Sequence, residues 1–504
     1  MNPYTILLIF LSYSALLFII AYYTSRKSTN ETYFRANKTS PWYVVAYGMI
    51  GASISGVTFI SIPGEVGTSG FSYLVLVFGY LVGYAVIAEV LLPVYYKKNL
   101  TSIYTYLKER FGDSSYKTGA SFFLLSRSMG SSLRIYLVVN VLQVFVFDAM
   151  GVPFAVNVAL FMGLVLLYTF KGGIKTIVWT DTLQTTFMLA AVGIFVYIIS
   201  DRLGLNLKSM FNMVADSDFS NMIYTDVNNK RYFLKQFISG IFIAIVMTGL
   251  DQNMMQKNLT CRNLKDAKKN IYTLSYLMVP VNLLFLSIGA LLYIFANQSG
   301  IAIPQQTDDL FPIIAFQYCS PFAGFVFFLG LIAAAYPSAG GALTSLTTSF
   351  CVDILGIKEN DKLTEKQKTK TRMSIHIAVT FFLTLLIVLF KVISDESVIS
   401  KLFTIAGYTY GPLLGLFAFG LFTKLPVRDK WVPVIAILSP MVCYLLSVNS
   451  EHLFNGYKFG FELLIYNGLI TFIGLWILSM GQKKKMQLKV KEVQLKEEVE
   501  EVFS

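Results

Sequence analysis

Residues 46–70, AYGMIGASISGVTFISIPGEVGTSG, constrain the fold more than any other part of the sequence. They lie in an apolar run long enough to cross a lipid bilayer, yet glycines, a proline and several hydroxyl residues interrupt it. Irregular backbone is tolerated at membrane depth only where it is buried in protein or lines a cavity. Broken helices of this kind offer oxygen atoms to ions and solutes near the middle of the membrane. We therefore predict a binding site here, with close helix packing through small residues as the alternative.

The composition is typical of a protein that crosses the membrane many times. Of its 504 residues, 55% are hydrophobic and only 14% are charged. Many apolar runs exceed the ~18–20 residues with which an α-helix spans the bilayer. We expect an all-α polytopic membrane protein with about thirteen transmembrane helices, located in the cell membrane as a multi-pass protein. The predicted spans are residues 4–23, 42–69, 72–96, 118–147, 152–169, 175–199, 234–256, 271–296, 321–352, 373–394, 400–423, 432–448 and 459–480.

Lysine and arginine residues follow every odd-numbered span of this prediction. Because short loops rich in these residues stay in the cytoplasm, the N-terminus is predicted outside and the C-terminus inside. The net charge of +12 then reflects topology, and no nucleic-acid partner is predicted. This pattern assigns Lys257 to the basic loop after the seventh span. The first apolar segment has neither a basic start nor a cleavage site, which favours a retained helix over a signal peptide.

Ionisable residues inside the predicted spans are candidates for function. Asp181 lies about two turns into the sixth span, where a carboxylate is costly unless it is paired or binds a cation. A structural hydrogen bond to a neighbouring helix is the alternative. Arg127 and Arg134 are seven residues apart and share one face of the fourth span. Arg134 is expected either to contact an anionic or polyhydroxylated solute or to brace the bundle.

Other polar residues favour structural roles. Asp251 opens DQNMMQKNL at the cytosolic end of a span, where a helix cap or ion pair competes with a functional role. His376 and His452 lie at span ends and are expected to be interfacial. The sequence contains no metal-binding cluster, nucleophile elbow or phosphate-binding loop, so it indicates no enzyme and no cofactor.

The ninth span holds a second group of small and hydroxyl residues, LIAAAYPSAGGALTSLTTSF. Pro337 removes one intrahelical hydrogen bond and is expected to free a carbonyl near residue 333. Carbonyl and hydroxyl oxygens are the ligands that hard cations prefer. We therefore predict a second interrupted helix, and paired interruptions in the two halves of a membrane protein indicate a transporter.

These segments resemble the sodium:solute symporter family, which includes sodium-coupled carriers of sugars, proline, pantothenate, iodide and sialic acid. The most specific part of the match is YTFKGGIKTIVWTDTLQ. The resemblance covers most of residues 30–425. It also runs through TYFRANKTSPWYVVAYGMIGASISGVTFISIPG, LPVYYKKNLTSIYTYLKERFG, GLDQNMMQKNL, the ninth span and YGPLLGLFAFGLF.

The resemblance implies a LeuT-type fold, a five-plus-five inverted repeat with added helices at both ends. The implied parts are an N-terminal helix and first cytoplasmic loop (1–41), a first repeat (42–200), an extracellular loop (201–233), a second repeat (234–424), two C-terminal helices (425–481) and a charged cytoplasmic tail (482–504).

The resemblance also implies where a coupling cation binds. The family's shared sodium site maps onto the carbonyls of Gly51, Ile54 and Ala334 and onto two hydroxyls, of which Ser338 is present and the other is replaced by Pro337. Some members hold a second sodium with the equivalent of Asp181. The two polar residues that assist it there are replaced in this chain by Gly340 and Gly341.

The solute is implied to lie beside the broken second span, at Ser53, Ser55 and Thr58, with Arg134 nearby. No added polar residue is evident on the third span in FSYLVLVFGYLVGY. The function implied is sodium-coupled symport of a sugar, sugar acid or similar metabolite by alternating access, with the lipid bilayer, sodium and the solute as partners. Sodium would be held by carbonyls, Ser338 and Thr344 or water. The alternatives are coupling to a proton on Asp181, an uncoupled facilitator, or a non-transporting sensor.

Overall fold

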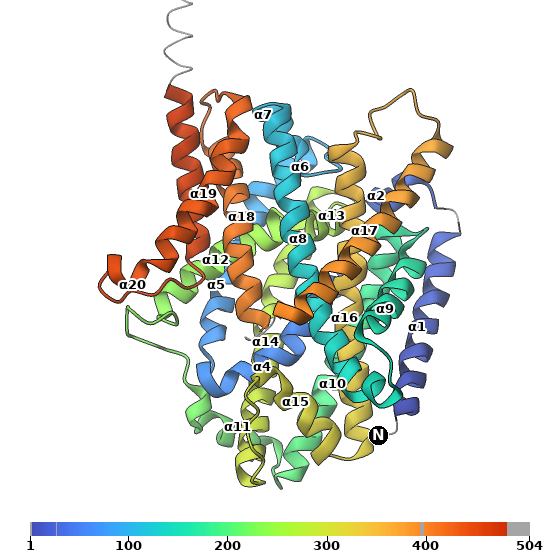
Figure 1. Ribbon diagram of the computed structural model, residues 1–504, viewed down its shortest axis with the longest axis vertical. Coiled ribbons are helices and arrows are strands. Elements are labelled where there is room, and N and C mark those ends of the chain that lie inside the picture. Colours follow the sequence, from blue (N-terminus) through green and yellow to red (C-terminus); the bar gives the residue numbers. More distant parts are fainter. Residues whose placement is uncertain (1–2, 27, 394–397, 481–504) are drawn as a thin grey trace, which may run out of the picture.

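The computed structural model describes residues 3–26, 28–393 and 398–480, which form a bundle of helices (Figure 1). Most long helices run along the long axis of the molecule. The short helices α2 (Asn30–Arg35), α6 (Leu92–Lys97) and α7 (Thr105–Arg110) lie at one end, and α11 (Leu207–Ala215) and α15 (Leu310–Ile313) lie at the other (Figure 1). The predicted tail at 482–504 lies outside the described residues.

A helix or a bent pair of helices occupies each predicted span. Among the described residues, ten helices are long and apolar enough to cross a membrane, and two bent pairs pass the same test. The unbent spans begin with α1 (Pro3–Ser25), α5 (Ser72–Val86), α8 (Asp113–Leu142), the shorter α9 (Phe154–Thr169), α10 (Gly173–Arg202) and α14 (Leu264–Gln298). They continue with α16 (Pro321–Ser349), α17 (Glu365–Ile393), α18 (Val398–Phe422), α19 (Val432–Val448) and a last helix, Leu463–Met480.

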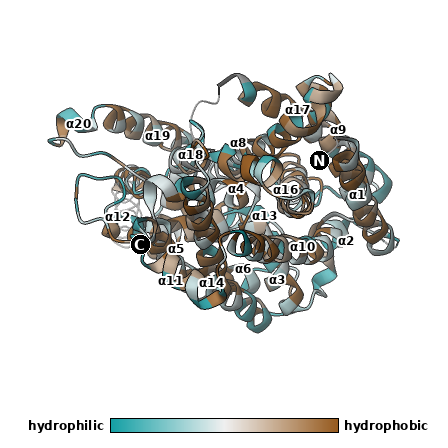
Figure 2. Cartoon of the chain, turned by 90° about the horizontal axis from the view of Figure 1, so that it is seen from below, coloured by the Kyte–Doolittle hydropathy of each residue, from teal (hydrophilic) through white to brown (hydrophobic). Residues whose placement is uncertain are grey.

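Apolar side chains cover the outside of the bundle as well as its core. Figure 2 shows hydrophobic ribbon on the peripheral helices α1, α17 and α19. On α17, the side chain of Phe381 is 72% exposed, which is expected when lipid rather than water surrounds the helix. Helix α16 is the opposite case, because nearly all of its residues are buried. An all-α membrane protein is therefore confirmed, while the direction in which the chain enters the membrane stays a prediction.

Two spans are broken. Helix α3 (Trp42–Ser53) meets α4 (Gly56–Ser69) at an angle of 53°, as the breakers in this stretch predict. The second break follows α12 (Phe233–Ala244), which continues to Gly249 and meets α13 (Gln252–Asn258) at 69°. These are the first spans of the two predicted repeats.

The prediction of an interrupted ninth span is wrong. Helix α16 runs without a break from Pro321 to Ser349 and contains Pro337 in its interior. A proline removes only one hydrogen bond, and tight packing on all sides holds the remaining turns in place. The break in the second half instead lies at Leu250 and Asp251.

Candidate functional site

A cavity adjoins the break between α3 and α4. Its lining includes Ser53, Ser55, Thr58 and Arg134, so the structure brings together all four residues predicted to contact the solute. Its volume of about 80 Å³ is well below the ~300–1,000 Å³ of most ligand pockets. A solute the size of a sugar therefore needs the surrounding side chains to move before it can bind.

The backbone at this break has free acceptors. Ile54 and Ser55 leave the helical conformation, and among the described residues the carbonyls of Gly51, Ala52, Ser53 and Ile54 accept no hydrogen bond that continues the helix. The hydroxyl of Ser53 is buried and also lacks a hydrogen-bond partner. Unpaired buried polar groups cost free energy, so this concentration of them indicates a ligand.

The two arginines of α8 differ in their surroundings, although both line the cavity. Arg127 lies 3.8 Å from the carboxylate of Asp251. In the orientation of the Asn253 amide that gives both its nitrogen and its oxygen a hydrogen-bond partner, the oxygen accepts from Arg127 at 2.7 Å. Arg134 has neither an ion pair nor a hydrogen bond within the described part of the chain, and its buried Nε has no acceptor. The cavity therefore presents one arginine without a counter-charge.

Helix α5 supplies polar groups that the sequence interpretation missed. Tyr73, Tyr80 and Tyr84 line the cavity, and the hydroxyls of Tyr73 and Tyr80 lie 3.3 Å apart. Spacings of seven and four residues place all three on one helical face. The spacing of these tyrosines in the sequence could have indicated a polar face on the third span. The prediction missed it because it looked for another kind of polar residue there.

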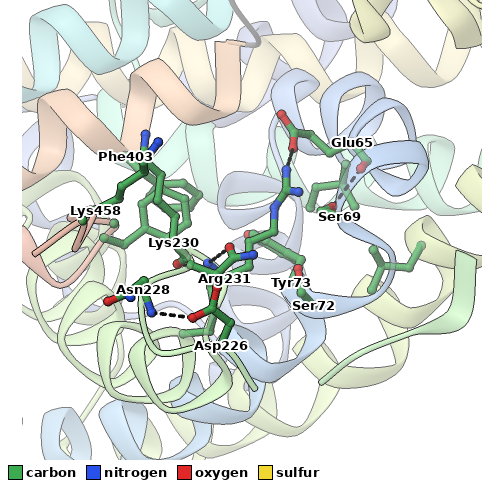
Figure 3. Close-up of a pocket in the computed structure, with 17 residues that line it drawn as sticks. Glu65, Ser69, Ser72, Tyr73, Asp226, Asn228, Lys230, Arg231, Phe403 and Lys458 are labelled. Carbon is green, nitrogen blue, oxygen red and sulfur yellow. Dashed lines mark hydrogen bonds and ion pairs between the residues drawn. The ribbon is translucent and has the colours of Figure 1, made fainter. Parts of the chain in front are cut away.

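A larger cavity of about 630 Å³ opens next to this one, on the side predicted to be extracellular. Figure 3 shows it between α4 and the segment that carries Asp226 and Arg231, and Arg231 pairs with Glu65 at 3.5 Å. Tyr73 and Phe403 line both cavities. The ring of Phe403 also packs 4.7 Å from that of Phe461. These aromatic side chains therefore separate an outer vestibule from the inner cavity.

Helix α16 passes beside the break. A Cβ atom at Gly330 would lie 2.7 Å from the ring of Phe59 on α4, so the two helices are in close contact there. Ala334 and Ser338 follow Gly330 by about one and two helical turns, in the direction of the break. The Ser338 hydroxyl is buried without a partner. On α3, the amide of Gly51 donates to Thr185 of α10 at 3.1 Å.

Asp181 has a protein cation beside it. The ammonium of Lys257 lies 2.5 Å from one carboxylate oxygen, and both side chains are 1% exposed. The assignment of Lys257 to a solvated basic loop is therefore wrong, because α13 turns back into the bundle after the second break. The available signal was local, because Lys257 lies between Gln256 and Asn258 in a segment rich in amide side chains, and the structure buries that whole segment.

The second break is stabilised by hydrogen bonds. The Asp251 carboxylate caps α13 by accepting from the amide of Met254, and it also accepts from the hydroxyl of Tyr410 at 2.5 Å. The carbonyls of Gly249 and Leu250 each accept from a buried tyrosine hydroxyl at 2.9 Å. Asp251 thus acts as a cap and an ion-pair partner.

His376 is not interfacial, contrary to the expectation. Its side chain is 1% exposed, and its ring nitrogens lie within hydrogen-bonding distance of Tyr33, Thr169 and Thr347. Helix α17 begins at Glu365, ahead of the predicted start at residue 373, so His376 lies inside the helix, where α2, α9 and α16 contact its ring. His452, in contrast, is exposed on α20 (Ser450–Leu453).

The broken helix, the paired cavities and the free oxygens define a membrane transporter. A sequence model of the sodium:solute symporter family matches residues 33–426, and the chain belongs to this family. The sodium/sialic acid symporter SiaT of Proteus mirabilis is 25% identical over 420 residues, covering 82% of this chain and 83% of that protein. The sodium/sialic acid symporter NanT of Aliivibrio fischeri is 26% identical over 420 residues, covering 81% of each.

The fold also has solved counterparts. A substrate-bound, outward-open Na⁺-coupled sialic acid symporter superposes with a TM-score of 0.80 at 22% identity, over 94% of this chain and 97% of that one. Mhp1, a nucleobase-cation symporter, superposes with a TM-score of 0.52 at 14% identity, over 88% of this chain and 92% of that one. The LeuT-type fold is confirmed. The protein is a sodium-coupled symporter of the cell membrane and not an enzyme.

Proposed function

We propose that the solute is a sugar acid or a similar polyhydroxylated anion, and that Arg134 binds its carboxylate. The observation that carries this proposal is the guanidinium of Arg134, which faces the cavity without an ion pair or hydrogen bond in the described chain. An unpaired buried charge is costly, and a carboxylate matches the planar fork of an arginine. The two sialic acid symporters among the relatives support this class of solute.

The remaining lining suits the hydroxyls of a sugar. Ser53, Ser55 and Thr58 lie on the broken span, and Tyr73, Tyr80 and Tyr84 face them from α5. Hydroxyl side chains both donate and accept, as sugar hydroxyls do. A site built to hydrogen-bond these groups rejects analogues that lack them, because its own polar groups would then stay unpaired.

We propose that the coupling sodium binds beside the solute, between the break and α16. Its ligands would be the carbonyls of Gly51, Ile54 and Ala334 and the hydroxyl of Ser338. The freed carbonyls of Gly51 and Ile54, together with a Ser338 hydroxyl that has no partner among the described residues, support this assignment. The loss of a hydroxyl at Pro337 leaves four protein oxygens. Sodium would hold α3, α4 and α16 in the arrangement that binds solute, since coupling requires that each ligand favour the same state.

Binding to the purified protein tests this function. We would measure the melting temperature with sialic acid, with a neutral hexose and with an amino acid, in sodium and in potassium buffers of equal ionic strength. A ligand of the native state raises the melting temperature. We expect the sugar acid to stabilise the protein in sodium only, and Arg134→Gln to remove that shift. A neutral hexose that stabilises as strongly as the acid would overturn the assignment of Arg134. Equal stabilisation in potassium would overturn the sodium site.

A further inference from the structure

The pair formed by Asp181 and Lys257 has no part in the solute or sodium sites described above. It joins α10 of the first predicted repeat to α13 of the second, across 76 positions of sequence. Both side chains are 1% exposed. Lys257 contacts one carboxylate oxygen of Asp181, and the other oxygen has no hydrogen-bond partner among the described residues. A buried carboxylate is stable when an opposite charge lies beside it, and here that charge is the ammonium of Lys257, a side chain of the protein itself.

The surroundings of the pair lack the two side-chain oxygens that some other family members place at positions 340 and 341, because both residues are glycines here. A side chain at Gly340 would overlap the hydroxyl of Tyr168, whose oxygen lies 1.9 Å from the Cβ position. A side chain at Gly341 would meet the Asn253 amide at 2.6 Å. Tyr168 itself donates to the carbonyl of Tyr336. Neighbouring side chains therefore fill the space in which hydroxyls at these two positions would lie.

A second sodium, which some members of the family hold with the equivalent of Asp181, does not fit these residues. We propose that the ammonium of Lys257 is a fixed cation that takes the place of this second sodium, so that the protein binds one sodium ion per transport cycle. The ammonium supplies the positive charge that Asp181 requires, and a sodium ion at the same oxygen would bring two cations together at one carboxylate. Within the described part of the chain, the site beside Ser338 is then the one at which sodium binds.

This inference goes beyond the identity of the solute, and its test needs none. We would follow the melting temperature of the full-length purified protein against sodium concentration, with choline holding the ionic strength constant. The rise in stability with the logarithm of ligand concentration reports the number of ions bound. We expect the wild-type slope to correspond to one ion. Ser338→Ala is the positive control, and we expect it to flatten the slope.

The decisive variant replaces both members of the pair with neutral residues, Asp181→Asn together with Lys257→Met. If neither residue binds sodium, this double variant keeps the wild-type slope, even if its melting temperature shifts. The single variant Lys257→Met should melt at a lower temperature in every salt, because it leaves the carboxylate uncompensated. Lys257→Arg keeps the charge and should retain the slope if the double variant does not fold.

Two results would overturn the proposal. One is a wild-type slope that corresponds to two ions, or two radioactive sodium ions bound per protein at saturation. The other is a double variant whose slope of melting temperature against sodium concentration corresponds to one ion fewer than that of the wild type, since Asp181 would then be a sodium ligand. The count of bound sodium uses the wild-type protein alone, so it decides the question even if no variant can be purified.

Discussion

The chain bends by 53° between α3 and α4 and by 69° between α12 and α13, and each bend releases backbone carbonyls from helical hydrogen bonding. At the first break, these carbonyls and the Ser53 hydroxyl have no donor in the described structure. At the second, Tyr95 and Tyr104 donate to the carbonyls of Gly249 and Leu250, and Asp251 caps the helix that follows. The first break therefore offers free oxygens, whereas at the second break side chains of the protein bind the carbonyls of Gly249 and Leu250.

The comparison teaches that a break in a membrane helix is not by itself a binding site. The backbone groups that it frees must be satisfied in one way or another at membrane depth. Where side chains satisfy them, the break anchors helices to one another. Where they stay free, an ion or solute can satisfy them, and binding then depends on the conformation of the break. Four substitutions test this contrast.

The largest effect is expected at the second break. Asp251→Asn removes the negative charge opposite Arg127 within the buried bundle. Breaking a buried ion pair at one partner costs about 3–5 kcal/mol, so we expect a clear fall in stability to denaturant in detergent. Glu89→Gln is the control, because Glu89 is half-exposed where it meets Lys268 and such pairs contribute ~0–1 kcal/mol. Equal stabilities for the two variants would contradict the anchoring role.

Tyr104→Phe should destabilise the protein less, by about 1–3 kcal/mol, because it leaves the carbonyl of Leu250 buried without a donor. The free energy of unfolding measures this loss. Tyr106→Phe is the matched control, since the Tyr106 hydroxyl makes no hydrogen bond within the described residues. If both variants unfold alike, the closure of the second break by tyrosine hydroxyls is incorrect.

Ser338→Ala should weaken sodium binding by roughly tenfold, which corresponds to ~1.4 kcal/mol. Without sodium, its stability should match that of the wild type, because the hydroxyl has no protein partner. Sodium activation of uptake into proteoliposomes measures the change. Ser345→Ala, on the same helix, removes a hydroxyl that already donates to Ala342 and should leave sodium affinity unchanged. If Ser338→Ala has the same sodium dependence of uptake as the wild type, Ser338 is not a sodium ligand.

The smallest effect is expected for Ser53→Ala. The Ser53 hydroxyl has no partner among the described residues, so stability should stay within ~0.5 kcal/mol of the wild type. Solute affinity should fall roughly threefold to tenfold, the equivalent of one hydrogen bond. Ser131→Ala is the control, because this hydroxyl is also buried and unpaired but does not line the cavity. If Ser53→Ala lowers the stability of the protein but leaves its solute affinity unchanged, the Ser53 hydroxyl has a structural role and does not bind the solute.

Much of the lining of the inner cavity could be predicted from the sequence. Ser53, Ser55 and Thr58 belong to one short irregular segment, so their proximity to one another is local, and Arg134 is recognisable as a charge inside an apolar span. The tyrosines of α5 were missed because aromatic residues are common on membrane helices, so their presence alone does not indicate a cavity. The continuity of α16 was missed because a proline alone does not reveal whether packing will hold the helix together.

Composition and local spacing by themselves determined the membrane class and the first broken span, and the resemblance of several segments indicated the family, because each depends on residues that are close together in sequence. Only the tertiary structure decided which charges meet. Arg127 faces Asp251, Lys257 faces Asp181, and Arg134 faces the cavity without a counter-charge. These arrangements depend on how the two predicted repeats pack against each other, and a buried charge is stable only beside a partner that packing brings to it. The function of each charged residue therefore follows from its neighbours in space, which its position along the chain does not reveal.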